Sequence, residues 1–180
     1  MEFYKMNVAG VDCELPICKL NDDLSIAGFV IFGNAPLTVA CARELLKIVP
    51  DFDYIVCPEA KSIPLGHEMS RQSGKKYFVL RKKPKAYMTE PVCIGVDSIT
   101  TAGHQELFID ALEGRQLTGK KVLLVDDVIS TGGSIDASEQ LVSKFDANIV
   151  GKAAILAEGD AAKRDDIIYL DELPLFFNKK

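Results

Sequence analysis

The sequence has five cysteines but no C-x-x-C pair, and only two histidines, among its 180 residues. It therefore predicts neither a zinc site nor a disulfide framework, and free thiols are expected in a reducing compartment. No apolar run approaches the ~20 residues that a membrane-spanning helix requires, and the N-terminus lacks the apolar core of a signal peptide. These absences favour a cytoplasmic protein without a membrane partner.

Positive charge is also scarce in relation to negative charge. The 21 lysines and arginines are outnumbered by 26 aspartates and glutamates, which leaves a net charge of −5. A broad basic surface is the footprint of a nucleic-acid-binding protein, so no nucleic-acid partner is expected. The length and an apolar content of 48%, without a low-complexity tract, predict one globular domain over residues 1–180.

The most informative segment runs from Lys121 to Ile135 and reads KVLLVDDVISTGGSI. The apolar run Val122 to Val125 is typical of a strand that is buried on both faces of a parallel sheet. The two acids Asp126 and Asp127 follow this run and end the expected strand. A hydroxyl- and glycine-rich turn comes next, before a helical pattern over Ile135 to Phe145.

This order of strand, acidic pair, glycine turn and helix indicates a phosphate site. The first N–H groups of a helix have no partner within the helix, and its dipole favours an anion there. Glycines allow close backbone approach, and the hydroxyls can donate hydrogen bonds. The carboxylates suit the two hydroxyls of a ribose or the waters around a magnesium ion. A Walker loop is excluded because its Gly-Lys-Ser/Thr ending is missing.

The stretch VLLVDDVISTGGS closely resembles the signature of the type I phosphoribosyltransferases, which bind 5-phosphoribosyl 1-diphosphate (PRPP). The resemblance implies that Asp126 and Asp127 hold the ribose hydroxyls. It also implies that the following turn holds the 5-phosphate. The residues expected at this phosphate are Ser130, Thr131, Gly132, Gly133 and Ser134.

Flanking patterns predict an α/β fold with a mostly parallel central sheet and helices on both faces. Asn34 is expected to cap a helix. A strand-helix-strand unit follows, with a strand at Asp53 to Cys57, a helix at Ile63 to Gln72 and a strand at Tyr77 to Arg81. Gly74 is expected to end its helix. The core is expected over residues 34–180.

Residues 1–33 read as a small β-rich segment outside this core, with extended pieces at Phe3 to Val8, Asp12 to Lys19 and Phe29 to Phe32. In the type I family, such a segment forms a hood over the base-binding site. The alternative is an edge ribbon that only covers the core. Leu175 to Phe177 is predicted to end the chain as a short strand, with Phe176 or Phe177 near the hood.

Two further turns are expected to meet the diphosphate of PRPP. Lys61 and Ser62 occupy the turn where adenine phosphoribosyltransferases carry Arg-Gly, and Lys61 can neutralise a diphosphate as a point charge. A basic run follows the next strand, where open α/β sheets bind ligands. Its candidates are Arg81, Lys82 and Lys85. The residues assigned a catalytic part are Lys61, Arg81, Asp126 and Asp127.

Two β arms, Val92 to Ile99 and Leu107 to Ile109, are predicted around a polar connection, Thr100 to Gln105. Type I enzymes carry a mobile loop at this place. Adenine phosphoribosyltransferases have a glutamate in that loop, whereas the best match here is Thr101. His104 could move a proton in its stead or be an exposed residue without a role.

The resemblance implies a glycosyltransferase (a pentosyltransferase) of purine salvage that transfers 5-phosphoribosyl from PRPP to a purine, adenine in the leading interpretation, and releases pyrophosphate. Glu158 and Asp160 are the candidates for hydrogen bonds to the base, or they cap a following helix. A magnesium ion is expected to be bound by the diphosphate of PRPP and by water molecules. Asp126 and Asp127 are further candidate ligands. A homodimer is also implied.

Two alternatives remain open. In one, the enzyme uses xanthine, guanine or hypoxanthine instead of adenine. In the other, the chain is a non-catalytic PRPP sensor that binds the same substrate without transferring it.

Overall fold

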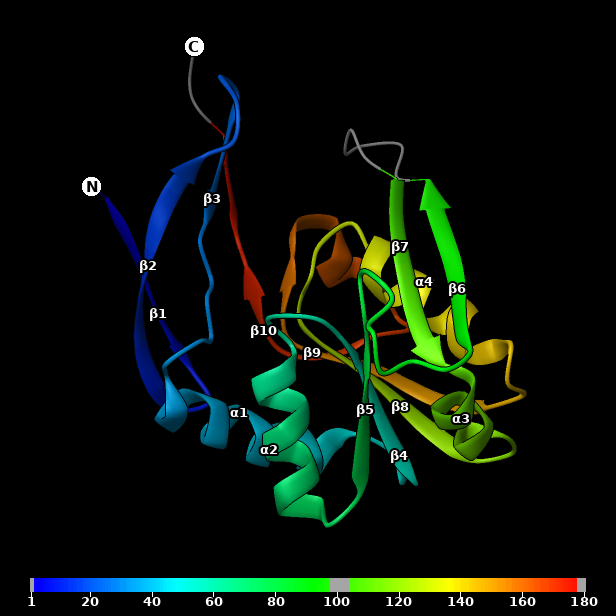
Figure 1. Ribbon diagram of the computed structural model, residues 1–180. Coiled ribbons are helices and arrows are strands. Elements are labelled where there is room, and N and C mark those ends of the chain that lie inside the picture. Colours follow the sequence, from blue (N-terminus) through cyan, green and yellow to red (C-terminus); the bar gives the residue numbers. More distant parts are fainter. Residues whose placement is uncertain (1, 98–103, 178–180) are drawn as a thin grey trace.

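A five-stranded parallel sheet forms the centre of the molecule in the computed structural model, which describes residues 2–97 and 104–177 (Figure 1). The strand order is β10-β9-β8-β4-β5, and each neighbouring pair is parallel. The parallel sheet confirms the predicted α/β class. Its strands are β4 (Tyr54–Pro58), β5 (Lys76–Leu80), β8 (Lys121–Ile129), β9 (Asn148–Glu158) and β10 (Ile168–Leu173).

Helices cover both faces of this sheet. Successive side chains of a strand point to opposite sides, and here the side chains on both sides are apolar, so each face needs a covering layer. In β8, Leu123 and Val125 pack in one apolar cluster with α1 (Ala35–Ile48) and α2 (Ile63–Ser73). Val122 and Leu124 pack in a second cluster with α4 (Gly133–Ser143). Short helical turns, α3 (Ala111–Gly114), η1 (Arg115–Leu117) and η2 (Gly159–Lys163), complete the layers. None of the described helices is long and apolar enough to cross a membrane.

Two helix ends follow directly from local chemistry. Asn34 Oδ1 accepts a hydrogen bond from the N–H of Leu37 at 3.1 Å, which satisfies one of the unpaired donors at the start of α1. Gly74 ends α2 with a φ of 71°, in the left-handed region that glycine adopts without strain. Both ends agree with the prediction.

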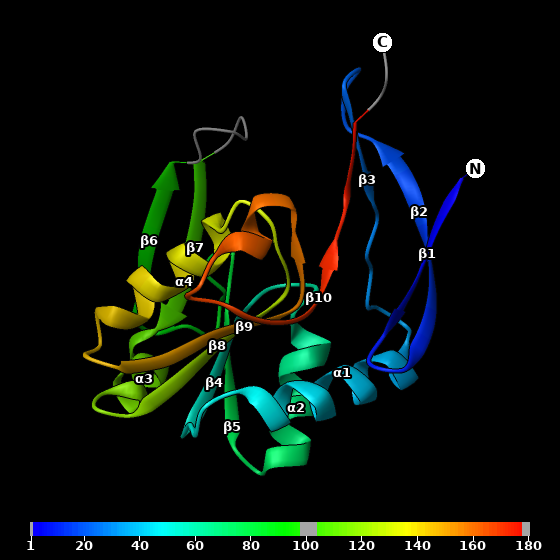
Figure 2. The same cartoon turned by 180° about the vertical axis from the view of Figure 1, so that it is seen from behind.

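The N-terminal strands form a second sheet of their own, with the order β1-β2-β3-β11. Its members are β1 (Phe3–Val8), β2 (Val11–Lys19), β3 (Leu24–Ala27) and, from the C-terminus, β11 (Leu175–Phe177). We call this sheet the hood. Tyr4 and Phe176 meet edge to face in it, with ring centroids 5.5 Å apart, so Phe176 lies at the hood as predicted. The first and last strands of the chain, β1 and β11, therefore belong to the same sheet (Figures 1 and 2).

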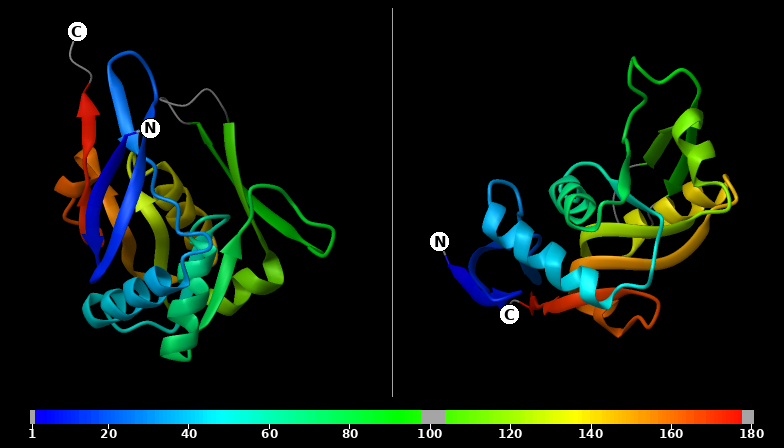
Figure 3. Two further views of the ribbon diagram at one scale, coloured as in Figure 1. Left: turned by 90° about the vertical axis from the view of Figure 1, so that its left-hand side faces the viewer. Right: turned by 90° about the horizontal axis from the view of Figure 1, so that it is seen from below.

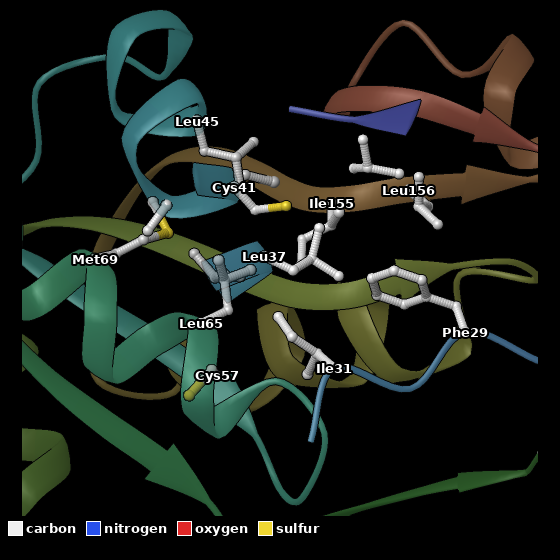
Figure 4. Close-up of a cluster of buried hydrophobic side chains, with 14 of the residues drawn as sticks. Phe29, Ile31, Leu37, Cys41, Leu45, Cys57, Leu65, Met69, Ile155 and Leu156 are labelled. Carbon is white, nitrogen blue, oxygen red and sulfur yellow. The ribbon is translucent and has the colours of Figure 1, made fainter. Parts of the chain in front are cut away.

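The predicted strand at Phe29 to Phe32 is wrong. Phe29 and Ile31 are buried in the core cluster beneath α1, while Val30 and Phe32 are about half exposed (Figure 4). The alternation of burial is thus real, but no neighbouring strand pairs with this segment. Its side chains fill the junction between the hood and the α1–α2 layer instead.

A two-stranded antiparallel arm, β6 (Pro91–Asp97) and β7 (His104–Asp110), confirms the predicted β arms. Arg81 and Phe108 exchange two backbone hydrogen bonds, at 2.8 and 2.7 Å, which fix the end of β5 against the arm. The arm and the hood extend on the same side of the sheet as the loop after β8 (Figure 3). Of the predicted polar connection, residues 100–103, Thr101 among them, lie outside the described residues. His104 and Gln105 belong to β7, so their placement in the connection was wrong.

Leu124 tests the double-sided burial of β8. Its side chain is fully buried in the α4 cluster. We expect Leu124→Ala to lower the free energy of unfolding by about 2–5 kcal/mol, because the surrounding sheet cannot collapse into the space. Leu112→Ala is the control, since Leu112 is 57% exposed and the change should shift stability by less than about 1 kcal/mol. Equal effects in urea unfolding would contradict the packing described here.

Candidate functional site

The site lies at the point where the strand order reverses. After β4 the chain continues outward to β5, whereas β8 pairs with the other edge of β4 and leads outward to β9 and β10. The turns that follow β4 and β8 therefore diverge, and open α/β sheets bind ligands in the crevice between such turns. Lys61 comes from the first turn, and Asp126 and Asp127 come from the second half of β8.

The acidic pair is buried within β8 and does not follow it. The strand runs on to Ile129, so the prediction that it ends before Asp126 is wrong. Asp126 and Asp127 are only 8% and 4% exposed. Lys61 Nζ lies 2.7 Å from Asp127 Oδ2, and Asp126 Oδ1 accepts a hydrogen bond from the N–H of Asp127 at 2.9 Å. The structure thus brings three of the predicted catalytic residues together.

Burial shapes the titration of Asp126. Burial raises the pKa of Asp126 to about 8, and the negative charge of Asp127 adds to the increase. The pKa of Glu158 is also raised by burial, and the charge of Lys61 opposes that increase. Lys61 therefore acts electrostatically on three carboxylates at once, and its side chain is still 45% exposed.

The turn after β8 forms a small hollow of about 50 Å³. Helix α4 begins at Gly133, earlier than predicted, so its free N–H groups face the turn directly. The lining comprises Asp126, Val128, Ile129, Ser130, Thr131, Gly132, Gly133, Ser134 and Ile135. All five residues predicted to hold the 5-phosphate are among them.

Gly132 is held in place from behind by Arg164. It has a φ of 86°, and a Cβ at this position would overlap Nη1 of Arg164 and approach Asp136 Oδ2 to 3.1 Å. Arg164 is itself fixed between Asp166, at 2.8 Å from Nε, and Asp136, at 3.0 Å from Nη2. The two carboxylates raise the pKa of Arg164 further above its usual range. No sequence signal had singled out this arginine.

The basic run after β5 converges on a carboxylate that sequence reasoning missed. Glu59 accepts a hydrogen bond from the N–H of Lys82 at 2.6 Å. Its side chain also lies 3.1 Å from Nε of Arg81 and 3.4 Å from Nζ of Lys85. An acid directly after one strand and a basic run directly after its neighbour were the available signal, since parallel neighbours end at one edge. Ser62 is buried and donates its hydroxyl to the carbonyl of Pro58, so its side chain faces the backbone.

A cavity of about 530 Å³ separates the hood from the core, within the size range of small-molecule sites. The core contributes Ser130 and Thr131 of the turn after β8, Glu158 at the end of β9, and Arg164. Leu24, Ile26 and Leu175 of the hood supply apolar walls. Asp160 also lines the cavity, but it is exposed and paired with Lys163 at 2.6 Å. Glu158 is therefore the better placed of the two predicted base-binding acids.

Asp126 and Asp127 are the acids to consider for a metal ion. Within the described part of the chain, no group of three or more His, Cys, Asp or Glu side chains is arranged to hold a metal ion. Two neighbouring carboxylates nevertheless fit magnesium, which proteins bind through one or two carboxylates together with substrate phosphates and water.

Because the pKa of Asp126 is raised, the free energy of unfolding should fall as the pH rises. An acid whose pKa is higher in the folded state stabilises the fold while it is protonated. This contribution is lost as the pH rises from about 4 through the folded value of about 8. Asp126→Asn cannot ionise, so its stability relative to wild type should increase across this window. Urea unfolding at about pH 5.5 and about pH 8.5 measures the change, and a pH-independent difference would refute it.

Gly132 offers a test of the loop geometry. Gly132→Ala should lower the free energy of unfolding by about 1–2 kcal/mol from the left-handed φ alone, and by more because of the overlap with Arg164. Gly133→Ala is the matched control, because only Thr131 Oγ1, at 3.8 Å, lies near its Cβ and its φ is negative. Its stability should be unchanged or slightly increased. Equal losses in thermal unfolding would contradict the described turn.

Comparison with known proteins agrees with the sequence resemblance. The model of the phosphoribosyl transferase domain matches residues 34–174. An adenine phosphoribosyltransferase of Desulforamulus reducens is 37% identical over 109 residues, 59% of this chain and 59% of that relative. The chain thus spans about three fifths of that relative's length. A hypoxanthine/guanine phosphoribosyltransferase of Methanobacterium lacus is 36% identical over 88% of this chain and 81% of its own.

A solved structure shares the fold. The adenine phosphoribosyltransferase of Thermoanaerobacter pseudethanolicus superposes with a TM-score of 0.72 at 21% identity, over 88% of this chain and 95% of its own. The chain therefore belongs to the phosphoribosyl transferase domain family and has the type I phosphoribosyltransferase fold.

Proposed function

We propose that this protein is a purine phosphoribosyltransferase, which transfers 5-phosphoribosyl from PRPP to a purine base and releases pyrophosphate. One observation carries the proposal. The turn after β8 borders a phosphate-sized hollow through its backbone and the 530 Å³ cavity through Ser130 and Thr131. A single ligand with a phosphate at one end and a flat apolar group at the other fits both spaces.

PRPP fits the charged groups in one orientation. Its 5-phosphate meets the N–H groups at the start of α4 and the hydroxyls of Ser130, Thr131 and Ser134. Its ribose hydroxyls donate to Asp126 and Asp127. Its diphosphate then extends toward the ends of β4 and β5, where Lys61, Arg81, Lys82 and Lys85 supply positive charge.

The reaction breaks the bond between the anomeric carbon and the diphosphate oxygen, which leaves with the electron pair. A purine nitrogen forms the new bond and loses its proton to the departing pyrophosphate or to water. Positive charge develops on the sugar by analogy with other glycosyl transfers. Magnesium, when bound to the diphosphate, supplies charge neutralisation for the leaving group. Lys61 and Arg81 stabilise the same departing charge, and the buried carboxylates favour the cationic sugar. Binding of the distant 5-phosphate positions the reacting carbon.

We propose adenine as the preferred base, on the strength of the adenine phosphoribosyltransferases among the relatives and structural neighbours. Glu158 would accept a hydrogen bond from a purine N–H or amino group, and Leu24, Ile26 and Leu175 would contact the ring faces. A 6-oxopurine is the second candidate. It is favoured by the relative from Methanobacterium lacus, which matches more of the chain, and by Arg164, a donor at the cavity wall.

A homodimer and a location in the cytoplasm remain predictions, as does the PRPP-sensing alternative. Such a sensor would bind PRPP without base-dependent release of pyrophosphate.

Pyrophosphate release from PRPP with magnesium, measured with adenine, hypoxanthine, guanine, xanthine or no base, tests the assignment. Release with adenine at a kcat/KM at least about tenfold above the other bases is expected. A preference for hypoxanthine or guanine would move the specificity to 6-oxopurines. Binding of PRPP without release with any base would reject the transferase and favour the sensor.

The acidic pair is tested by the double variant Asp126→Asn with Asp127→Asn. Replacement of both acids by amides should lower kcat/KM for PRPP by at least about 100-fold, because the pair would no longer accept hydrogen bonds from the ribose hydroxyls as it does in the wild type and the charge of Asp127 would be lost. The matched control is Asp22→Asn with Asp23→Asn, a consecutive acidic pair that is exposed in the hood turn. Unchanged turnover in the first variant, with the fold verified by circular dichroism, would remove the central role of the pair.

A further inference from the structure

We infer that Glu59 is a positioning residue that holds the cationic groups of the diphosphate subsite in their binding geometry. The inference rests on the proposed function, because it concerns the diphosphate end of the same ligand. It assigns a part to a residue that neither the motif nor the basic run indicates.

A carboxylate inside an anion-binding subsite is unexpected, since it repels the ligand. The side chain of Glu59 is nevertheless only 15% exposed and faces inward at the end of β4. It spans two segments that are far apart in the sequence, because the N–H of Glu59 donates to Leu80 O and its carboxylate accepts from the N–H of Lys82. Glu59 therefore connects the turn after β4 to the end of β5.

Charge explains why an acid is useful here. Arg81, Lys82 and Lys85 are close in the sequence, and without a counter-charge their repulsion would spread them into solvent. Glu59 pairs with Arg81 and Lys85 together. Burial alone would raise the pKa of Glu59, but the Lys82 N–H and the two cations lower it, so it stays ionised near neutral pH.

The contact with Arg81 also determines which donors remain. Glu59 lies 3.1 Å from Nε of Arg81, the inner nitrogen of the guanidinium. The contact is an ion pair by distance, because Nε of Arg81 is buried without a hydrogen bond in the described part of the chain. A guanidinium has five N–H donors in a planar fork, so its two terminal nitrogens can serve another ligand. Those terminal groups match two oxygens of a diphosphate. Backbone hydrogen bonds to Phe108 fix the main chain of Arg81, and Glu59 contacts its guanidinium.

The test compares two probes that divide the ligand: magnesium pyrophosphate, which matches only the diphosphate end, and ribose 5-phosphate, which lacks the diphosphate. Binding of each is measured by calorimetry for wild type, Glu59→Ala and Glu59→Gln. Glu59→Ala should raise the Kd for pyrophosphate by about tenfold or more and leave that for ribose 5-phosphate unchanged. Glu59→Gln keeps an acceptor for the Lys82 N–H without the charge, so its increase should be smaller.

Glu90→Gln is the matched control. Glu90 forms an exposed ion pair with Arg115, with 3.2 Å between Oε2 and Nη1, and this pair lies away from the site. The inference is overturned if pyrophosphate binds the Glu59 variants as it binds wild type, if both probes weaken together, or if wild type binds no pyrophosphate. Should Glu59→Ala fail to fold, Glu59→Gln decides alone. A wild type that binds both probes but releases no pyrophosphate with any base contradicts the transferase and leaves the role of Glu59 intact.

Discussion

The buried pair Asp126–Asp127 is the constraint on which the rest of the structure depends. Two adjacent carboxylates at the end of the central strand are costly to bury, because each loses its hydration and repels the other. The fold compensates with Lys61 from the neighbouring strand's turn and with a raised pKa at Asp126. A ligand with hydroxyl donors would satisfy the oxygens of these acids. The costly burial of two carboxylates therefore points to the position of the proposed sugar site.

The strand order makes this compensation possible. Because β8 and β4 are neighbours whose following turns diverge, Lys61 and the carboxylates approach each other from opposite sides of one crevice. The same order places the end of β5, with Arg81 and its partner Glu59, one strand further along. Under the proposed function, the end of β8 and the turns after β4 and β5 would bind the phosphate, ribose and diphosphate of one ligand in a row. The hood adds the apolar wall that the sheet itself lacks, and β11 joins the C-terminus to it.

Much of this was predictable from local sequence. The motif around Asp126, the caps at Asn34 and Gly74, and the β arms all depend on residues close to one another in the chain, so their chemistry is visible in the sequence. What was missed depends on contacts between distant segments. The counter-ion role of Glu59 requires β4 and β5 to be parallel neighbours. The contact of Arg164 with Gly132 requires the segment at the end of η2 to pack against the turn after β8. The extended segment Phe29 to Phe32 alternates like a strand, because one-sided burial produces that pattern even where no partner strand exists.

The most direct test of the account is a crystal structure with a nucleoside 5′-monophosphate bound, since such a product contains phosphate, ribose and base in one molecule. The phosphate is predicted at the N–H groups that begin α4, the ribose hydroxyls at Asp126 and Asp127, and the base between Glu158 and the hood. A nucleotide bound elsewhere, or with its ribose away from the two carboxylates, would contradict the central claim that the buried acidic pair of β8 is the sugar site.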